Sequence, residues 1–289
     1  MEFGAIFPQI EVAGSPAAVR DYAVRAEALG YDYILAYDHI LGANPDRAGG
    51  WRGPYTYQDP FLEPFVLFSY MAAVTERIGL ATGIIILPQR QTALVAKQAA
   101  TLDRLSGGRL RLGVGLGWNE VEYQALGQDF HRRGKRIEHQ VPLLRALWTS
   151  ELITWDDPAH HIPDAGINPL PIQQPIPIWF GGSADPALRR MARHGDGWIM
   201  TIRDPEAARP KLALIADALR AEGRDRAAFG IEAAIDYGDG DPTRWRGRLR
   251  EWQALGVTKV AVNTMRSNLT WPAGHLDAIA RFLDAVRDI

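Results

Sequence analysis

Eight short apolar runs, each followed by a stretch with apolar residues at helical spacing, account for nearly all of this 289-residue chain. Strict alternation of strand and helix predicts parallel strands joined by right-handed crossovers. Eight such units predict one domain over residues 1–289, an α/β fold of the closed (β/α)8 TIM barrel type, which usually needs about 250 residues. The runs are Glu2–Phe7, Tyr33–Tyr37, Ile78–Leu87, Arg109–Gly115, Ile176–Phe180, Gly197–Met200, Phe229–Ile235 and Lys259–Asn263.

Composition excludes several classes of protein. The formal net charge of -2 gives no case for a nucleic-acid partner. The longest apolar stretch, Ile78–Pro88, is much shorter than the ~20 residues that a membrane helix needs. The chain has no cysteine, so disulfides, a thiolate nucleophile and cysteine-ligated metals are absent. We therefore expect a cytoplasmic enzyme without a membrane partner.

Helix starts are predicted where a capping side chain precedes proline. The side-chain oxygen accepts an unpaired backbone N–H, and proline suits the first helical position because it lacks that donor. Gly30 is expected to end the first helix as a left-handed cap. The capping pairs are Ser15-Pro16, Asp59-Pro60, Asp185-Pro186, Asp204-Pro205 and Asp241-Pro242.

Two connections are longer than barrel loops usually are. Asp38 to Asp59 follows the second run and is rich in glycine and aromatic residues, among them Trp51. Because long loops in compact domains often carry function, we interpret it as a lid or substrate wall rather than a plain surface loop. Glu151 to Pro175, with five prolines, is a second insertion, before the fifth strand.

The pair Asp38-His39 lies where the second strand is expected to end. Histidine exchanges protons near neutral pH, and a nearby carboxylate can fix its tautomer. Because barrel chemistry lies at the carboxyl ends of the strands, we expect both residues to be catalytic. The alternative is a structural aspartate that caps the loop beside an exposed histidine.

Glycines follow the fourth and fifth runs. Gly115 and Gly117 would let a flat ring or a phosphate approach the backbone, and close strand–helix packing is the alternative. Gly181-Gly182-Ser183 precedes a predicted helix and so offers an anion site, with a mere tight turn as the alternative.

The helix after the fourth run is expected to start at Asn119. Glu122, three residues on, would complete a capping box with it. The preceding glycines are not a dinucleotide fingerprint, because the third glycine of that pattern would fall at Trp118.

No metal site is predicted. His160 and His161 are adjacent and have no partner at helical spacing. No His-x-His follows the first run, no lysine lies in the sixth, and paired carboxylates at strand ends are missing, which disfavours metal-dependent hydrolases, Schiff-base aldolases and glycosidases. The basic run His131–Arg136 is interpreted as a solvated helix entrance that could alternatively meet an acidic ligand.

The block Ala96–Leu110 (AKQAATLDRLSGGRL), continued by Gly113–Trp118, resembles the bacterial luciferase-like monooxygenase superfamily. Ile178–Ser183 (IWFGGS) and Gly195–Trp198 (GDGW) share the resemblance, which runs in order over essentially the full chain. It implies a luciferase-like barrel enzyme that binds FMN or the deazaflavin coenzyme F420 at the carboxyl rim, and the pattern looks most like the F420-dependent oxidoreductase branch.

The resemblance also implies residue roles. Gly181, Gly182 and Ser183 match the turn that binds the coenzyme phosphate. Thr82, Gly83 and Ile84 match a strand bulge that supports the central ring and often contains a cis peptide bond, expected here between Gly83 and Ile84. Asp38 would contact the coenzyme and His39 the reacting substrate.

One departure concerns the substrate. F420-dependent sugar-phosphate dehydrogenases carry a glutamate acid where this chain has Trp118, and an indole cannot exchange a proton at neutral pH. A sugar phosphate is therefore disfavoured, and Trp118, like Trp51, is expected to form a wall of the substrate pocket.

The resemblance favours hydride transfer between F420 and a small organic substrate, with His39 moving the accompanying proton. The alternative is an FMN-dependent monooxygenase that uses oxygen and a separate flavin reductase. A non-oxidoreductase barrel and a pure binding protein are the other classes, and relatives imply a homodimer. The acidic tail of F420 would favour basic groups beside the cleft, for which the candidates are Arg47, Arg52, Arg90 and Lys259.

Overall fold

The main sheet of the protein closes into a barrel. The computed structural model describes residues 1–11 and 14–289. The strands follow the order β3-β2-β1-β11-β10-β9-β8-β5, each pairing is parallel, and β3 pairs with β5 to close the ring. The expected (β/α)8 barrel is therefore confirmed. Its strands are β1 (Glu2–Ile6), β2 (Tyr33–Ala36), β3 (Gly79–Thr82), β4 (Ile85–Ile86), β5 (Leu110–Gly115), β8 (Ile178–Gly181), β9 (Gly197–Ile199), β10 (Gly230–Asp236) and β11 (Lys259–Asn263).

The third expected strand is interrupted by a bulge. β3 ends at Thr82, and β4 resumes beyond Gly83 and Ile84 and pairs with β5. Ile84 has a φ of 112°, which a β-branched residue adopts only under strain of about 1–3 kcal/mol. Every cis bond among the described residues precedes a proline, so the expected cis bond between Gly83 and Ile84 is wrong. The bulge is instead formed with a positive φ at Ile84, and β3 and β4 on either side of it both run parallel to β5.

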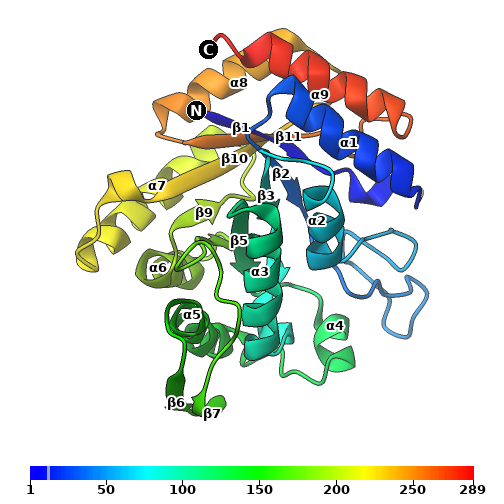
Figure 1. Ribbon diagram of the computed structural model, residues 1–289. Coiled ribbons are helices and arrows are strands. Elements are labelled where there is room, and N and C mark those ends of the chain that lie inside the picture. The colour runs from blue at the N-terminus through cyan, green and yellow to red at the C-terminus, as the bar shows by residue number, and fades with distance from the viewer. Residues whose placement is uncertain (12–13) are drawn as a thin grey trace.

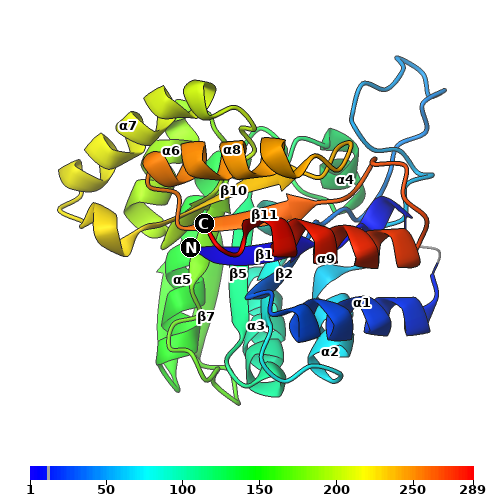
Figure 2. The ribbon, with the colours of Figure 1, turned by 90° about the horizontal axis from the view of Figure 1, so that it is seen from above.

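Helices surround the barrel, as Figures 1 and 2 show from two directions. Their inner faces pack onto the outward-facing strand residues, which together form the main hydrophobic core. In the described ranges, no helix combines the length and apolarity that crossing a bilayer requires. The helices are α1 (Pro16–Leu29), α2 (Pro64–Ala72), α3 (Thr92–Ser106), α4 (Glu120–Ala125), α5 (Arg133–Thr149), α6 (Asp185–His194), α7 (Pro205–Ala221), α8 (Pro242–Ala254) and α9 (Ala273–Val286), with 3-10 turns η1 (Gln9–Glu11), η2 (Leu87–Gln89) and η3 (Arg226–Ala228).

Three of the predicted helix starts are confirmed. Ser15, Asp204 and Asp241 are N-caps, and each side chain accepts a backbone N–H from the first turn while proline follows. Gly30 ends α1 with a φ of 91°, as expected of a left-handed cap.

Of the other two predicted starts, the one at Asp59 is wrong, and the one at Asp185 is right in position but not in its cap. The carboxylate of Asp59 accepts the backbone N–H of Thr56, so it serves the loop, and α2 begins after Glu63, which caps the N–H of Val66. α6 begins at Asp185 as predicted, but Ala184 occupies the N-cap position and the side chain of Asp185 caps no backbone N–H of the described residues. Its carboxylate forms an ion pair with Lys211 at 2.6 Å.

The two insertions differ in structure. The first, after β2, projects from the barrel beside α4 without a helix or strand of its own (light blue in Figure 2). The second contains a hairpin of β6 (Ile153–Asp157) and β7 (His160–Ala165). Asp157 ties this hairpin together by accepting the N–H groups of Trp155 and His160. Nε2 of His160 lies 2.7 Å from the hydroxyl of Thr92, within hydrogen-bond distance. His160 therefore connects the hairpin to α3.

Candidate active site

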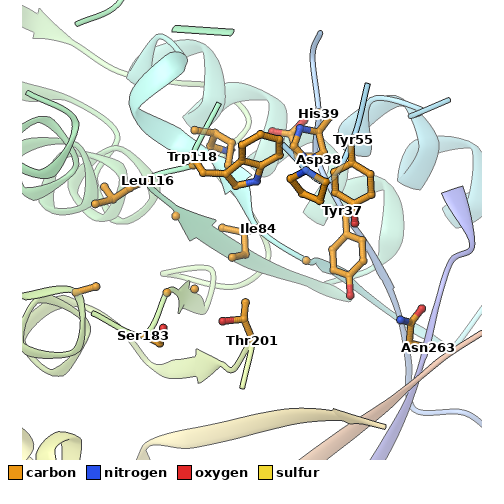
Figure 3. A pocket seen from close by; sticks show the side chains of 18 of the residues that line it. Tyr37, Asp38, His39, Tyr55, Ile84, Leu116, Trp118, Ser183, Thr201 and Asn263 are labelled. Atoms are coloured by element: carbon orange, nitrogen blue, oxygen red, sulfur yellow. The ribbon is translucent and has the colours of Figure 1, made fainter. Parts of the chain in front are cut away.

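A cavity of about 570 Å³ lies at the carboxyl ends of the barrel strands. It gathers residues from β2, the bulge, β5, β8, β9 and β11, which are far apart in the sequence (Figure 3). Among the expected site residues, Thr82 and Trp51 do not line it. Those that do are Asp38, His39, Gly83, Ile84, Gly115, Gly117, Trp118, Gly181, Gly182 and Ser183.

Ile84 lies centrally in the cavity, and two of the expected glycines make room for it (Figure 3). A Cβ atom added to Gly181 would lie 1.7 Å from Cδ1 of Ile84, and one added to Gly115 would lie 2.5 Å from its Cγ2. These glycines are therefore required by strand packing around the bulge. The result is an apolar platform beside which Gly115 and Gly181 raise no side chain.

The turn after β8 presents backbone donors. Gly182 has a φ of 104°, in the region that favours glycine. In the described part of the chain, the N–H groups of Ser183 and Ala184 donate to no protein acceptor. The indole Nε1 of buried Trp198 donates to the carbonyl of Gly182 at 2.8 Å and holds the turn in place. Free N–H groups at the start of a helix are the arrangement that binds anions in proteins.

His39 is bound by a carboxylate distant in sequence. Its Nδ1 lies 3.0 Å from Oε1 of Glu122, which also accepts the backbone N–H groups of Ile40 and Leu41. The other oxygen, Oε2, accepts Nε2 of Gln89 at 3.0 Å. Burial alone would raise the pKa of Glu122, but the hydrogen bonds from His39 and Gln89 outweigh it and hold that pKa below its usual value.

This arrangement corrects two expectations. Asn119 does cap α4, by accepting the N–H of Val121, but Glu122 does not complete a capping box because its carboxylate is turned to His39. Asp38 does not contact His39 either. Successive side chains of an extended chain point to opposite sides, so adjacent residues seldom pair.

Asp38 instead forms a buried ion pair. Its two oxygens lie 2.9 and 3.0 Å from one nitrogen of Arg90, and one of them also accepts the N–H of Ile86, just past the bulge. Burial raises the pKa of Asp38, and the Arg90 charge opposes that rise without cancelling it. Arg90 is further bound to Glu63. Asp38 therefore connects the end of β2 to the segment just past the bulge. Arg90 and Glu63 continue this hydrogen-bonded network away from Asp38.

Aromatic rings enclose His39. Tyr55 and Phe61 lie 4.8 Å away between ring centroids, and Trp118 lies 5.3 Å away. Trp118 is therefore a wall of the cavity, as expected. Trp51 lies behind it at 5.7 Å, bound to the carbonyl of Tyr55, so the expectation that Trp51 lines the pocket directly is wrong.

Thr82 is the second expected contact that the structure places elsewhere. Its fully buried hydroxyl donates to the carbonyl of Gly113 at 2.8 Å and accepts the N–H of the same residue at 2.7 Å. The side chain thus replaces ladder hydrogen bonds that the bulge interrupts between β3 and β5. A Cβ atom at Gly113 would lie 2.0 Å from the carbonyl oxygen of Thr82, so that glycine also serves packing.

The expected basic groups do not surround the cavity. Arg90 is neutralised by two carboxylates, and Lys259 pairs with Glu2 at the opposite end of the barrel. Arg47 and Arg52 line a separate hollow behind Trp118.

Three other arginines line the cavity, and sequence reasoning missed them: Arg133, Arg203 and Arg266. Arg203 and Arg266 follow the sixth and eighth strands, which was an available signal. Arg133 belongs to the basic run His131–Arg136, for which the sequence offers a solvated helix entrance or, as the alternative, contact with an acidic ligand. Its guanidinium carbon lies 3.7 Å from the centre of the Phe130 ring, which holds the side chain at the start of α5.

Nothing in the described ranges gathers three metal-ligating side chains at one place. The charged side chains that line the cavity are Asp38, which is paired with Arg90 behind it, and the three arginines.

The family model for luciferase-like monooxygenases matches residues 1–285. The chain is 41% identical over 193 residues to the uncharacterised protein Rv0940c of Mycobacterium tuberculosis, a match that covers 64% of this chain and 65% of that protein. It is 31% identical over 256 residues to the F420-dependent glucose-6-phosphate dehydrogenase of Intrasporangium calvum, covering 84% of this chain and 72% of that enzyme.

Solved structures share the fold. The long-chain alkane monooxygenase LadA superimposes with a TM-score of 0.81 at 12% identity, covering 100% of this chain and 91% of LadA. An F420-dependent secondary alcohol dehydrogenase in complex with an F420-acetone adduct gives a TM-score of 0.71 at 18% identity, covering 99% of this chain and 90% of that one. At these identities the likeness concerns the fold alone, which is the expected luciferase-like barrel.

Proposed function

Because this chain belongs to the luciferase-like monooxygenase family, we propose that it is an oxidoreductase that transfers a hydride between coenzyme F420 and a small organic substrate. The observation that carries the proposal is one cavity that joins three parts: the platform of Ile84, the open N–H groups of the turn after β8, and His39. The relative and the solved structure whose names include F420 support the choice of coenzyme.

The residues present fit such a coenzyme. A tricyclic ring would lie on Ile84, where Gly115 and Gly181 leave the platform clear. A phosphate would take the N–H groups of Ser183 and Ala184, which no protein acceptor in the described ranges satisfies. The cavity volume of about 570 Å³ is within the usual range for ligand sites. When bound, F420 would supply the hydride donor or acceptor.

The chain itself manages the proton and the surroundings. His39 would give or take the proton that accompanies hydride transfer, because its imidazole lines the cavity and an imidazole can both donate and accept a proton. Trp118, Tyr55 and Phe61 limit the motion of that ring and keep water from its faces. Asp38, through Arg90 and Ile86, would keep the bulge in the shape that supports the ring.

The alternative is an FMN-dependent monooxygenase. FMN presents a tricyclic ring and a terminal phosphate, so the platform and the turn would serve it equally. The observation that favours it is Arg133, whose charge lines the same cavity and would complement the second negative charge of a phosphomonoester.

The test is an equilibrium titration of the protein with F420 and with FMN in parallel, each in oxidised and reduced form. Quenching of tryptophan fluorescence is a suitable signal because Trp118 lines the cavity. The proposal expects saturable binding of F420 at a lower concentration than FMN. Tighter binding of FMN would favour the alternative, and binding of neither would overturn both.

A further inference from the structure

Glu122 accepts hydrogen bonds from more groups than Asp38, the other buried carboxylate of the site. Its side chain is 1% exposed and accepts four donors: His39 Nδ1, two backbone N–H groups and Gln89 Nε2. An ionised carboxylate can only accept, and it is the ionised form that four donors stabilise. A nitrogen 3.0 Å from such an oxygen must therefore carry a hydrogen.

That requirement decides the tautomer of His39. A neutral imidazole has one N–H, so a hydrogen on Nδ1 leaves Nε2 as a lone pair. Among the described residues Nε2 has no hydrogen-bond partner, and it is not among the buried unpaired atoms, so it is open. The rings of Tyr55, Phe61 and Trp118 restrict rotation that would exchange the two nitrogens.

We propose that Glu122, supported by Gln89, is a positioning residue that keeps a proton on Nδ1 of His39 and so makes Nε2 the nitrogen that exchanges protons with a molecule in the cavity. This inference deepens the proposed function and rests on it for the catalytic meaning of Nε2. The tautomer itself is a property of the free protein. It can therefore be tested without coenzyme or substrate.

Gln89 provides the means to separate charge from hydrogen bonding. Its Nε2 binds Glu122, while its Oε1 is buried without a partner. In Glu122→Gln, the new amide oxygen can still accept from His39, Ile40 and Leu41. The new NH2 group can then donate to Gln89 after that amide rotates by half a turn. Glu122→Gln therefore retains the acceptor for Nδ1–H and removes only the charge, whereas Glu122→Ala removes both.

The experiment is ¹⁵N NMR of the coenzyme-free protein with ring-labelled histidine, recorded above about pH 8, where an ordinary histidine is neutral. The chain has seven histidines, and the His39 signals are identified by their loss in His39→Asn. We expect a protonated Nδ1 and a bare Nε2 in the wild type and in Glu122→Gln. In Glu122→Ala we expect both tautomers to be populated.

A wild-type spectrum with the hydrogen on Nε2, or with a mixture, would overturn the inference, and it needs no variant that might fail to fold. An unchanged Nδ1–H tautomer in folded Glu122→Ala would overturn it as well, because something else would then hold that proton. These outcomes are independent of the coenzyme titration. A failure of the inference is thus distinguishable from a failure of the proposed function.

Discussion

Nδ1 of His39 lies 3.0 Å from Oε1 of Glu122, although 83 residues separate the two in the chain. The bond joins the loop after β2 to α4 and converts a loop histidine into one with a fixed orientation. Asp38 and His39 are adjacent just after β2 but have different partners. Asp38 binds Arg90, whereas His39 binds Glu122, which in turn binds Gln89. Gln89 and Arg90 are adjacent in the segment after the bulge. That segment therefore supports His39 through Glu122 and Asp38 through Arg90.

Replacing His39 by asparagine should lower turnover and leave coenzyme binding nearly unchanged. Loss of a positioned acid or base costs about 10²- to 10⁴-fold in rate. The measurement is kcat from the coenzyme absorbance with a substrate that supports turnover, beside the dissociation constant of the coenzyme. His131→Asn is the matched control, since His131 is exposed and outside the cavity. Turnover of His39→Asn equal to that of the control would remove His39 from the mechanism.

Gly182→Ala should weaken coenzyme binding at least about tenfold. Its φ of 104° disfavours any Cβ atom, so the turn must change shape and its N–H groups must move. Gly223→Ala is the control, because Gly223 has a φ of 67° with open space around it and lies away from the cavity. Both variants should lose about 1–2 kcal/mol of unfolding free energy. Only Gly182→Ala should lose affinity, and equal affinities would contradict the phosphate role of this turn.

Thr82→Val should destabilise the barrel without changing coenzyme affinity. The isosteric valine leaves the buried N–H and carbonyl of Gly113 without their present partners, at a cost of about 2–4 kcal/mol. Urea unfolding of the variant and the wild type measures this cost. A large loss of affinity at unchanged stability would show instead that Thr82 contacts the coenzyme directly.

His275 should make stability depend on pH. Burial lowers the pKa of His275 to about 4 from the usual 6.5, so the unfolded chain binds the extra proton first as pH falls. The free energy of unfolding should therefore be highest above about pH 6.5 and should fall as the pH is lowered toward 4. The total loss attributable to His275 is about 3 kcal/mol. The unfolding free energy of His275→Gln should be flatter over this range. The same slope in both proteins would exclude His275 as the cause.

Most of the barrel could be predicted from the sequence, because buried parallel strands are short apolar runs and the runs are separated by amphipathic stretches. The third run is the exception. Its apolar pattern indicates one strand over Ile78–Leu87, and only the family resemblance placed a bulge at Thr82–Ile84, where the strand is interrupted and the φ of Ile84 is positive. The side chain of Ile84 then occupies the space that Gly115 and Gly181 leave on two other strands, which a local pattern does not reveal.

The location of a candidate residue was predictable where it follows from the position of a strand end, and His39, Trp118 and the Gly181 turn do line the cavity. The hydrogen-bond partners of these residues were not predictable where they come from distant parts of the sequence. Glu122 has the spacing of a capping box, yet its carboxylate binds a histidine from another loop. Asp38 and His39 are neighbours in sequence but turn to different partners. Local sequence patterns indicate where helices start. The hydrogen-bond partners of cavity residues depend on which loops the folded barrel brings together.

The most direct test of the account is a crystal structure of the protein with F420 bound. The account predicts the tricyclic ring across Ile84, the phosphate on the N–H groups of Ser183 and Ala184, and Nε2 of His39 facing the open side of the ring. A ring bound elsewhere, or a phosphate distant from the turn after β8, would contradict it.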